Sequence, residues 1–308
     1  MAQKYRLITR SDFDGLVCAV LLKELDLIDD ILFVHPKDMQ DGKIAVTDRD
    51  ISTNLPYVPG IHLAFDHHLS ETIRNEARPN HIISPTAPSA ARVVWDHYGG
   101  RTAFPHVRED MMVAVDKADS ADFTVDEILD PTGWVLLSYL MDARTGLGRF
   151  RNFRVSNYQL MIDLIDYCRG HGIDDILTLP DVRERVDLYF EHDPKAKQQI
   201  RRCTTQNGKV AVLDLRNEET IYATNRFTIY ALFPKINVSI HVLWGRDKQN
   251  TVLAVGKSIV DRSAKVNIGE VCLGYDGGGH EAAGTCQIAN DKVEGVLVEL
   301  VEKIQAAG

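Results

Sequence analysis

Residues 61–68 read Ile-His-Leu-Ala-Phe-Asp-His-His, an apolar run that ends in a carboxylate and two consecutive imidazoles. Such groups lose favourable hydration at the mouth of a buried strand unless something compensates them. A divalent cation compensates all three, since carboxylate oxygen and neutral imidazole nitrogen are its usual ligands. The alternative is that Asp66, His67 and His68 only cap the strand and face water. The run therefore predicts a strand whose carboxyl end is either a metal site or a solvated turn.

The start of the chain has the same order of apolar and polar segments. Residues 5–9 read as a buried strand, 10–15 as an acidic loop and 16–25 as a buried helix. This is the opening of a βαβ unit, whose loops at strand carboxyl ends form ligand sites. We expect further strands at 31–34, 44–47 and 61–66, and helices at 89–98, 107–119 and over much of 130–203. This alternation predicts an α/β fold with a doubly wound parallel sheet.

The pattern changes near residues 204–208, which read Thr-Thr-Gln-Asn-Gly. Beyond them, strands are expected at 210–215, 238–243, 252–255 and 285–288, with helices at 225–233, at 267–273 and from 291. We predict a smaller α+β domain here. The expected domains are therefore 1–180 and 206–308, joined by a helical linker over 181–205.

Composition narrows the class of protein. The chain has 308 residues, 44% of them hydrophobic and 26% charged, and a formal net charge of −9. Proteins that bind long nucleic acid usually have an excess of basic over acidic residues, so we expect no long nucleic acid as partner. No run is long enough to span a membrane, and Met1–Arg6 lacks the layout of a signal peptide. The five widely spaced cysteines read as reduced thiols, so we expect a cytoplasmic protein.

Asp12 and Asp14 lie two residues apart at the end of the first expected strand. In extended backbone their side chains leave the same face. Two carboxylates about 4 Å apart repel by about 4 kcal/mol at an effective dielectric constant of about 20. Either protonation or a cation between them relieves that repulsion. The alternative is that Asp14 only favours the N-terminus of the following helix.

Further acidic clusters follow other apolar segments. Asp50 (or Asp48) follows the expected third strand, and Asp119 (or Asp116) ends an expected helix. The carboxyl ends of parallel strands meet at one edge of a sheet, where these groups would join Asp12, Asp14 and residues 66–68. Two cations held there about 3.5–4 Å apart can activate water and stabilise an in-line phosphoryl displacement. The pattern therefore favours a two-metal site.

Residues 277–280 read Gly-Gly-Gly-His. Glycines without Cβ let backbone N–H groups approach a ligand closely and form an anion cradle. A histidine beside them can donate to phosphate or stack on a base. The alternative is a helix end followed by a tight turn.

In combination, residues 11–15, 66–68 and 277–280 resemble the signature motifs of the DHH/DHHA1 phosphoesterases. That superfamily includes RecJ-type exonucleases, oligoribonucleases, cyclic-di-AMP phosphodiesterases and family II inorganic pyrophosphatases. The resemblance covers both expected domains in the right order. It implies that 1–180 is the catalytic, metal-binding domain and that 206–308 binds substrate.

The resemblance also implies roles for individual residues. The residues implied to hold two Mn²⁺ ions, for which Mg²⁺ or Co²⁺ could substitute, are Asp12, Asp14, Asp50, His67 and Asp119. Asp50 would bridge the ions, His68 would lie by the reacting phosphate, and Asp66 would orient His67. The residues implied to bind substrate are Gly277, Gly278, Gly279, His280 and Arg262, with a solvated surface arginine as the alternative for Arg262.

The chain departs from the family at one position. Many relatives have a histidine just before the first aspartate pair, as a ligand of the first metal, whereas this chain has Arg10 nearby. Either that metal has fewer protein ligands, or Arg10 contacts a substrate phosphate. Farther along, Arg144, Arg149, Arg151 and Arg154 form a basic stretch that we interpret as a solvated face, with binding of a second phosphate as the lesser alternative.

The expected function is that of an Mn²⁺-dependent phosphodiesterase. It would hydrolyse short nucleotide substrates, such as pGpG or nanoRNA, to mononucleotides by a water that two metals activate. One alternative is a phosphoanhydride hydrolase acting on pyrophosphate or polyphosphate. Another is a nucleotide sensor that has lost one metal. The expected partner is a small nucleotide or short oligonucleotide, with no membrane, and a homodimer is left open.

Overall fold

The computed structural model describes residues 3–307, and the chain divides into two compact units. The first comprises the chain up to Phe123 together with Pro131–Asp187, and the second comprises Thr124–Asp130 and the chain from Leu188. Helix α10 (Pro180–Cys203) runs through the division and covers most of the expected linker over 181–205. Each unit has its own sheet.

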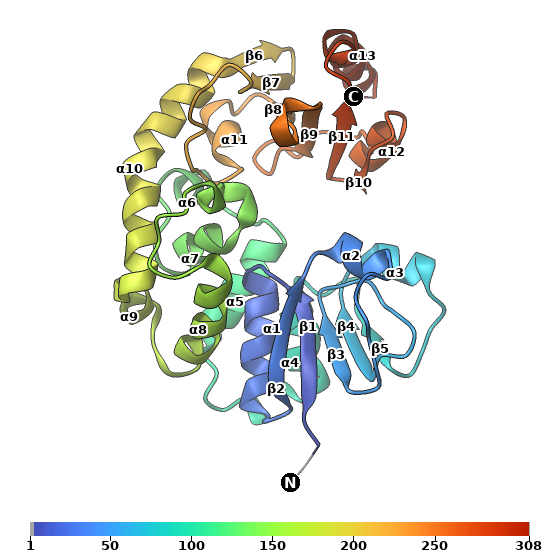
Figure 1. The fold of residues 1–308 in the computed structure, drawn as a ribbon, viewed down its shortest axis with the longest axis vertical. Coiled ribbons are helices and arrows are strands. Elements are labelled where there is room, and N and C mark those ends of the chain that lie inside the picture. The colour runs from blue at the N-terminus through green and yellow to red at the C-terminus, as the bar shows by residue number, and fades with distance from the viewer. Residues whose placement is uncertain (1–2, 308) are drawn as a thin grey trace. The chain divides into compact units, whose positions relative to one another are not determined.

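The sheet of the first unit is parallel throughout, as predicted. Its strands are β1 (Tyr5–Arg10), β2 (Ile28–Val34), β3 (Asp50–Thr53), β4 (Leu63–Asp66) and β5 (His81–Ile83), in the spatial order β2-β1-β3-β4-β5. Figure 1 shows these strands in blue and cyan, with their carboxyl ends on the same side. Because every strand runs the same way, the loops that follow the strands share one edge of the sheet.

The core of this unit is built around α1 (Phe13–Glu24). Every residue from Phe13 to Leu22 is buried, and all of them except Asp14 and Gly15 are apolar, so this part of the helix faces protein on all sides. It packs against β1 and against α4 (Ala90–His97), α5 (Glu109–Asp119) and α8 (Asn157–Gly170). The helices that complete the unit are α2 (Pro36–Gln40), α3 (Leu69–Arg74), α7 (Gly133–Met141) and α9 (Ile173–Thr178).

The predicted strand over 44–47 is wrong. The strand lies a few residues later, at β3, and Ile44 and Val46 instead pack from a loop against a cluster that includes Ile8 and Met39. The backbone N–H and hydroxyl of Thr47 both donate to the Asp50 carboxylate, which holds this segment in a turn. An apolar run can cover a sheet as well as join it, and the local sequence does not distinguish the two.

The second unit contains a mixed sheet of six strands. They are β6 (Thr204–Asn207), β7 (Val210–Asp214), β8 (Val238–Trp244), β9 (Thr251–Lys257), β10 (Gly278–His280) and β11 (Ala283–Ile288), in the spatial order β10-β11-β9-β8-β7-β6. Strands β7 and β8 are parallel and the other neighbours are antiparallel. The helices of this unit are α6 (Val125–Leu129), α11 (Thr228–Leu232), α12 (Ile268–Leu273) and α13 (Val293–Ala306).

The apolar core of the second unit lies between this sheet and two helices. Ile240 and Leu253 of the sheet pack with Ile268 of α12 and Leu300 of α13, and all four are fully buried. These two helices and the mixed sheet give the α+β arrangement that was predicted. Within residues 3–307, none of the helices combines the length and the apolar character that a membrane span requires.

Candidate metal centre

The carboxylate of Asp14 lies buried in the first turn of α1. Its two oxygens accept hydrogen bonds from the backbone N–H groups of Ala90 (3.0 Å) and Ala91 (2.8 Å), the first residues of α4. The free N–H groups of a helix N-terminus are natural partners of a carboxylate. Asp14 is therefore positioned by two helices at once.

His67 directly follows β4 and meets the last residue of α5. Its Nε2 lies 2.9 Å from Oδ2 of Asp119, while its Nδ1 lies 3.2 Å from the carbonyl oxygen of Ala87. Since a carbonyl only accepts, Nδ1 carries a hydrogen and donates to it. This contact fixes the ring so that Nε2 faces the carboxylate, which leaves Nε2 as the ligand atom.

Asp14, His67 and Asp119 form one cluster. Each offers a ligand atom, and these atoms lie within 4.8 Å of one another. Burial and the charge of Asp119 raise the pKa of Asp14 well above its usual range. Burial opposes protonation of His67, but the hydrogen bond and charge of Asp119 outweigh it and raise the pKa of His67 to about 9. A cation that binds here must therefore displace a proton from His67.

Asp12 lies beside this cluster but has other partners. It caps α1, and its Oδ1 accepts from the backbone N–H of Gly15 (3.0 Å) and from Nδ2 of Asn54 (3.3 Å). Its Oδ2 lies 2.9 Å from Nε of Arg10. Burial raises the pKa of Asp12, although the charge of Arg10 acts in the opposite direction. Both carboxylate oxygens are thus already engaged.

Asn54 occupies the position immediately after β3, and the sequence analysis did not single it out. Its backbone has a φ of 56°, in the left-handed region that asparagine tolerates. Its side chain is buried, and Oδ1 has no hydrogen-bond partner among the described residues. The polar ending of Ile51-Ser52-Thr53-Asn54 is the signal that could have identified it.

The structure does not bring Asp50 to this edge, which corrects the prediction. Strand β3 begins at Asp50, which pairs with Arg6 across from β1 at the amino end of the sheet. Its carboxylate binds Nε of Arg6 at 2.8 Å, and this contact contributes to the lowered pKa of Asp50. At about 3.3 Å per residue, the far end of the strand at Thr53 lies about 10 Å away. The alternative residue, Asp48, lies in an exposed turn before the strand.

Asp116 lies one helical turn before Asp119 and faces other partners. Its Oδ1 accepts from the hydroxyl of Ser89 at 2.7 Å, and its Oδ2 accepts from Nε of Arg92 at 3.0 Å. These contacts tie α5 to the start of α4. Of the two candidates, the structure therefore brings Asp119 and not Asp116 to His67.

Asp66 has a different partner from the one predicted. It is fully buried, and its Oδ1 lies 2.7 Å from Nδ1 of His68. The carbonyl of Ala87, and not Asp66, orients His67. His68 is 44% exposed, so its Nε2 is accessible to a ligand while Asp66 holds its Nδ1. The side chain that Asp66 orients is therefore the exposed histidine.

Arg144 adds positive charge on the Asp12 side of the centre. Its Nε donates to Oδ1 of Asp142 at 2.7 Å. Its pKa is raised because the charges of Asp142, Asp12 and Asp119 outweigh the effect of burial. Arg144 and the other arginines of this stretch are exposed, as the interpretation as a solvated face predicts, and the charge of Arg144 also acts on Asp12 and Asp119.

The glycine segment of the second unit is an edge strand. Residues 278–280 form β10, which pairs with β11 only. A Cβ on Gly279 would overlap the carbonyl oxygen of Ala283, whereas a Cβ on Gly278 would meet nothing within 4 Å. Gly277 is as crowded as Gly279, so close packing accounts for two of the three glycines. An anion cradle formed by these residues stays a prediction.

The two polar side chains predicted near this segment are exposed. Nδ1 of His280 accepts from the backbone N–H of Ala282 at 3.2 Å. Nε of Arg262 donates to the carbonyl oxygen of Ile259 at 3.2 Å. These local contacts fix one end of each side chain. Their roles in binding substrate stay predictions.

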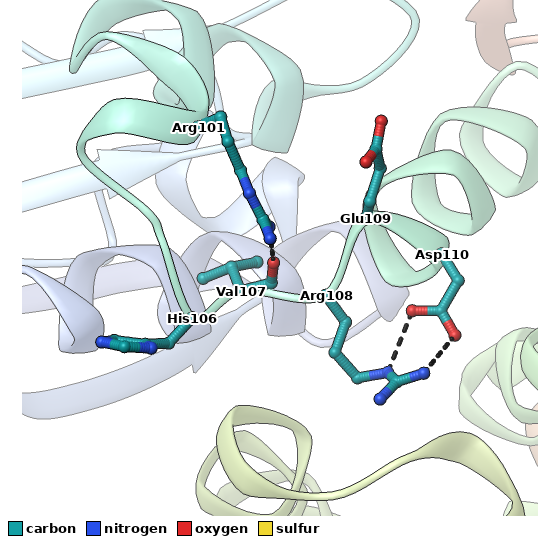
Figure 2. Close-up of a pocket in the computed structure, with 6 residues that line it drawn as sticks. All are labelled: Arg101, His106, Val107, Arg108, Glu109 and Asp110. Carbon is teal, nitrogen blue, oxygen red and sulfur yellow. Dashed lines mark hydrogen bonds and ion pairs between the residues drawn. The ribbon is translucent and has the colours of Figure 1, made fainter.

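A hollow in the first unit lies away from these residues. It has a volume of about 420 Å³ and is lined by Arg101, His106, Val107, Arg108, Glu109 and Asp110. Figure 2 shows that Arg101 points to the Val107 carbonyl and that Arg108 pairs with Asp110. The hollow lies at the amino end of α5, and Asp119 lies at its carboxyl end, about 15 Å along the helix. It is not part of the metal centre.

The donor set of the cluster fits a divalent cation. Two carboxylates and one imidazole are ligands that Mn²⁺, Mg²⁺ or Co²⁺ accept in proteins. The raised pKa of Asp14 shows a carboxylate whose charge the protein leaves under-compensated. The unpartnered Oδ1 of Asn54 provides a further buried acceptor near Asp12. A bound cation would compensate the charge of Asp14, and a water on that cation would donate a hydrogen bond to Oδ1 of Asn54.

Comparison with known proteins gave matches among solved structures only, because no family model and no curated protein matches the sequence. The chain is 63% identical to the pGpG-specific phosphodiesterase PggH from Vibrio cholerae, covering 99% of this chain and 100% of that one with a TM-score of 0.87. Two other structures show the fold alone. One is an exopolyphosphatase-related protein from Bacteroides fragilis, with 14% identity, 98% of this chain and 92% of that chain covered, and a TM-score of 0.56. The other is RecJ with Mg²⁺ from Thermus thermophilus, with 12% identity, 99% of this chain and 50% of that chain covered, and a TM-score of 0.53.

Proposed function

Because this chain belongs to the DHH/DHHA1 phosphoesterase family, we propose that it is a phosphodiesterase that hydrolyses pGpG and similar linear dinucleotides to mononucleotides. The observation that carries this proposal is the 63% identity, over practically the whole of both chains, with a pGpG-specific phosphodiesterase. The net charge of −9 supports a short substrate, because a long polymer anion would be repelled.

We propose that Asp14, His67 and Asp119 hold a divalent cation, with Mn²⁺ as the physiological ion and Mg²⁺ or Co²⁺ as substitutes. When bound, such a cation supplies a water of lowered pKa and positive charge for the scissile phosphate. Asp12 lies next to this set, where it is paired with Arg10. The burial of Asp14 and the contact of Asp119 with His67 keep the two carboxylates directed at one point.

His68 is proposed to act on the substrate. Asp66 accepts the hydrogen of Nδ1 and so leaves Nε2, on the exposed side of the ring, as the atom that meets the substrate. In the neutral ring Nε2 accepts a hydrogen, and in the protonated ring it donates to the phosphate or to the leaving oxygen. Asp66 acts through His68, as a positioning residue.

Candidate nucleotide-binding residues are proposed for each unit separately. In the first unit, Arg10 and Arg144 offer guanidinium groups for phosphate oxygens. In the second unit, the segment Gly277–His280 and Arg262 are proposed to contact the nucleotide, and Gly278 has open space where a side chain would lie. The proposed location is the cytoplasm, since the five cysteines are free thiols, as they would be in a reducing compartment.

A product assay tests the proposal. The purified chain is stripped with a chelator, supplied with Mn²⁺, Mg²⁺ or Co²⁺, and given pGpG, pApA, a pentanucleotide RNA, pAp, pyrophosphate or long-chain polyphosphate. We expect preferred conversion of pGpG to GMP and no turnover before metal is added. Phosphate release from pyrophosphate or polyphosphate alone would assign the chain to the anhydride hydrolases. Tight binding of pGpG without products in saturating Mn²⁺ would identify a sensor.

A further inference from the structure

We propose that the metal centre takes one divalent cation per chain, and that the guanidinium of Arg10 occupies the place of a second. This deepens the proposed function, because it concerns the same centre and rests on it. It departs from the two-metal site that the sequence motifs favour. The proposal rests on the partners of the acidic residues in the centre. Asp14 and Asp119 form the first set, with His67, and Asp12 forms the second set, with Arg10.

The first set is complete for a single cation. Asp14, His67 and Asp119 direct ligand atoms at one another, and these atoms lie within 4.8 Å of one another. Asp14 accepts hydrogen bonds from two backbone N–H groups and a long one from the thiol of Cys18, all of them uncharged donors, which leave lone pairs of both its oxygens available. His67 is held by a carbonyl at Nδ1, so Nε2 is fixed in place. These three side chains already converge on one place in the structure.

The second set is already neutralised by the protein. Asp12 contacts Arg10 through one oxygen and Gly15 and Asn54 through the other. The charge of Arg144 acts on Asp12 as well. A second cation at Asp12 would have to break the Arg10 contact and would be repelled by a guanidinium that is always charged. The place beside Asp12 is therefore filled.

The carboxylate expected to bridge two cations is also missing from this edge. Two cations about 3.5–4 Å apart repel each other, and a carboxylate that both ions share would offset that repulsion. Strand β3 and the turn before it contain the acidic residues Asp48 and Asp50, and both lie at the amino side of β3. At the carboxyl end of that strand the chain has Asn54, whose neutral amide donates to Asp12. An amide cannot supply the negative charge that would hold two divalent ions together.

Arg10 has a role that fits this position. Its side chain is 35% exposed, so the guanidinium edge that does not contact Asp12 can meet a substrate phosphate. A guanidinium neutralises charge on the phosphate as a second cation would, but it cannot activate water. Activation of water is therefore assigned to the centre formed by Asp14, His67 and Asp119, and positioning of the phosphate to Arg10.

Counting bound ions tests the proposal without measuring activity. Metal-free chain is titrated with Mn²⁺ by calorimetry, the bound metal is measured after dialysis, and the Mn²⁺ electron paramagnetic resonance spectrum is recorded. We expect one ion per chain and the spectrum of an isolated ion. Two ions of similar affinity, or the spectrum of a coupled pair, would overturn the proposal, and so would the absence of binding.

Two variants sharpen the test. The double variant Arg10→His/Asn54→Asp supplies an imidazole and a carboxylate beside Asp12, and we expect it to bind two ions. The matched control is Arg108→His, since Arg108 pairs with Asp110 two residues on in the same way that Arg10 pairs with Asp12. The control should bind one ion. A folded double variant that still binds one ion would overturn the assignment to Arg10 and Asn54.

The role of Arg10 at the phosphate has its own readout. We expect Arg10→Gln to keep one bound ion and to raise KM for pGpG about tenfold, with recovery in Arg10→Lys. An unchanged KM would show that Arg10 only neutralises Asp12. The ion count and the product assay are independent, so a chain that binds one ion but leaves pGpG intact would refute the proposed function and not this inference.

Discussion

Two histidines, one in each unit, have their pKa values shifted in opposite directions. In the first unit, His67 lies against Asp119 and near Asp14 and Asp66, and its pKa rises to about 9. In the second unit, His241 lies in β8, where burial alone lowers its pKa to about 4. The comparison teaches that burial by itself keeps a histidine neutral and structural. Carboxylates that converge on it make it part of a charged centre.

The two sheets explain this difference. The parallel sheet of the first unit places the ends of all its strands at one edge, so Asp12, Asn54 and His67 come together from three neighbouring strands. In the second unit most neighbouring strands are antiparallel, so successive loops lie at opposite edges. Polar groups therefore accumulate at one edge of the first sheet, whereas tight backbone packing characterises the glycine segment of the second.

The largest expected effect is at the metal centre. Asp14→Asn removes one charged ligand and should lower kcat/KM for pGpG by about 10³-fold, equivalent to about 4 kcal/mol of transition-state stabilisation. Mn²⁺ affinity, measured by calorimetry, should fall with it. The control is Asp116→Asn, which removes a carboxylate that contacts Ser89 and Arg92 and not the cluster. Equal losses in the two variants would show that the cluster has no special role.

The next effect is on the stability of the second unit. Gly279→Ala places a Cβ against Ala283 and Gly284, where only backbone atoms lie, and should cost about 2–3 kcal/mol of unfolding free energy. Gly278→Ala is the matched control in the same strand, because its Cβ meets nothing within 4 Å. Urea denaturation measures both. If Gly278→Ala destabilises as much as Gly279→Ala, packing does not explain the glycines.

A smaller effect on activity is expected at Asp66, which acts on the substrate through His68. Asp66→Asn weakens the hold on His68 and should lower kcat for pGpG about 10- to 100-fold, with the metal count unchanged. Glu71→Gln is the control, since Glu71 is also buried but contacts Tyr57 and Arg74. If Asp66→Asn instead loses the metal, Asp66 supports the cation centre directly.

The smallest effect is a dependence of stability on pH in the second unit. The pKa of His241 is about 4 in the folded chain and 6.5 in its ordinary state. As pH falls from about 6.5 to about 4, the unfolded chain takes up this proton first, so the folded state loses stability. Relative to His241→Gln, the wild-type urea midpoint should fall over this window.

The matched control for that titration is His171→Gln, which removes an exposed histidine at the end of α8. It should follow the wild-type pH dependence. A constant difference between wild type and His241→Gln from pH 7.5 to 4.5 would show that His241 is accessible to protons in the folded state. Since each comparison is made between variants at the same pH, titration of the metal centre cancels.

Much of the centre could be predicted from local sequence. Asp12 and Asp14 follow an apolar strand directly, and His67 follows another, so their place at the carboxyl edge depends only on the strands being parallel. The alternation of expected strands and helices along the sequence was sufficient to predict that the strands are parallel. The choice between Asp116 and Asp119 needed the position of α5, because both residues lie on the same helix and only their contacts differ.

The sequence by itself determined the parallel α/β sheet, the second α+β unit and the place of Asp14 and His67 at one edge of the sheet, with either Asp116 or Asp119 beside them. Only the tertiary structure decided that Asp50 lies at the wrong end of β3, that Asn54 takes its place, and that Arg10 neutralises Asp12. The physical reason is that strand register and side-chain pairing depend on partners far along the chain. An apolar run of four residues gives no local sign of which partner it will meet.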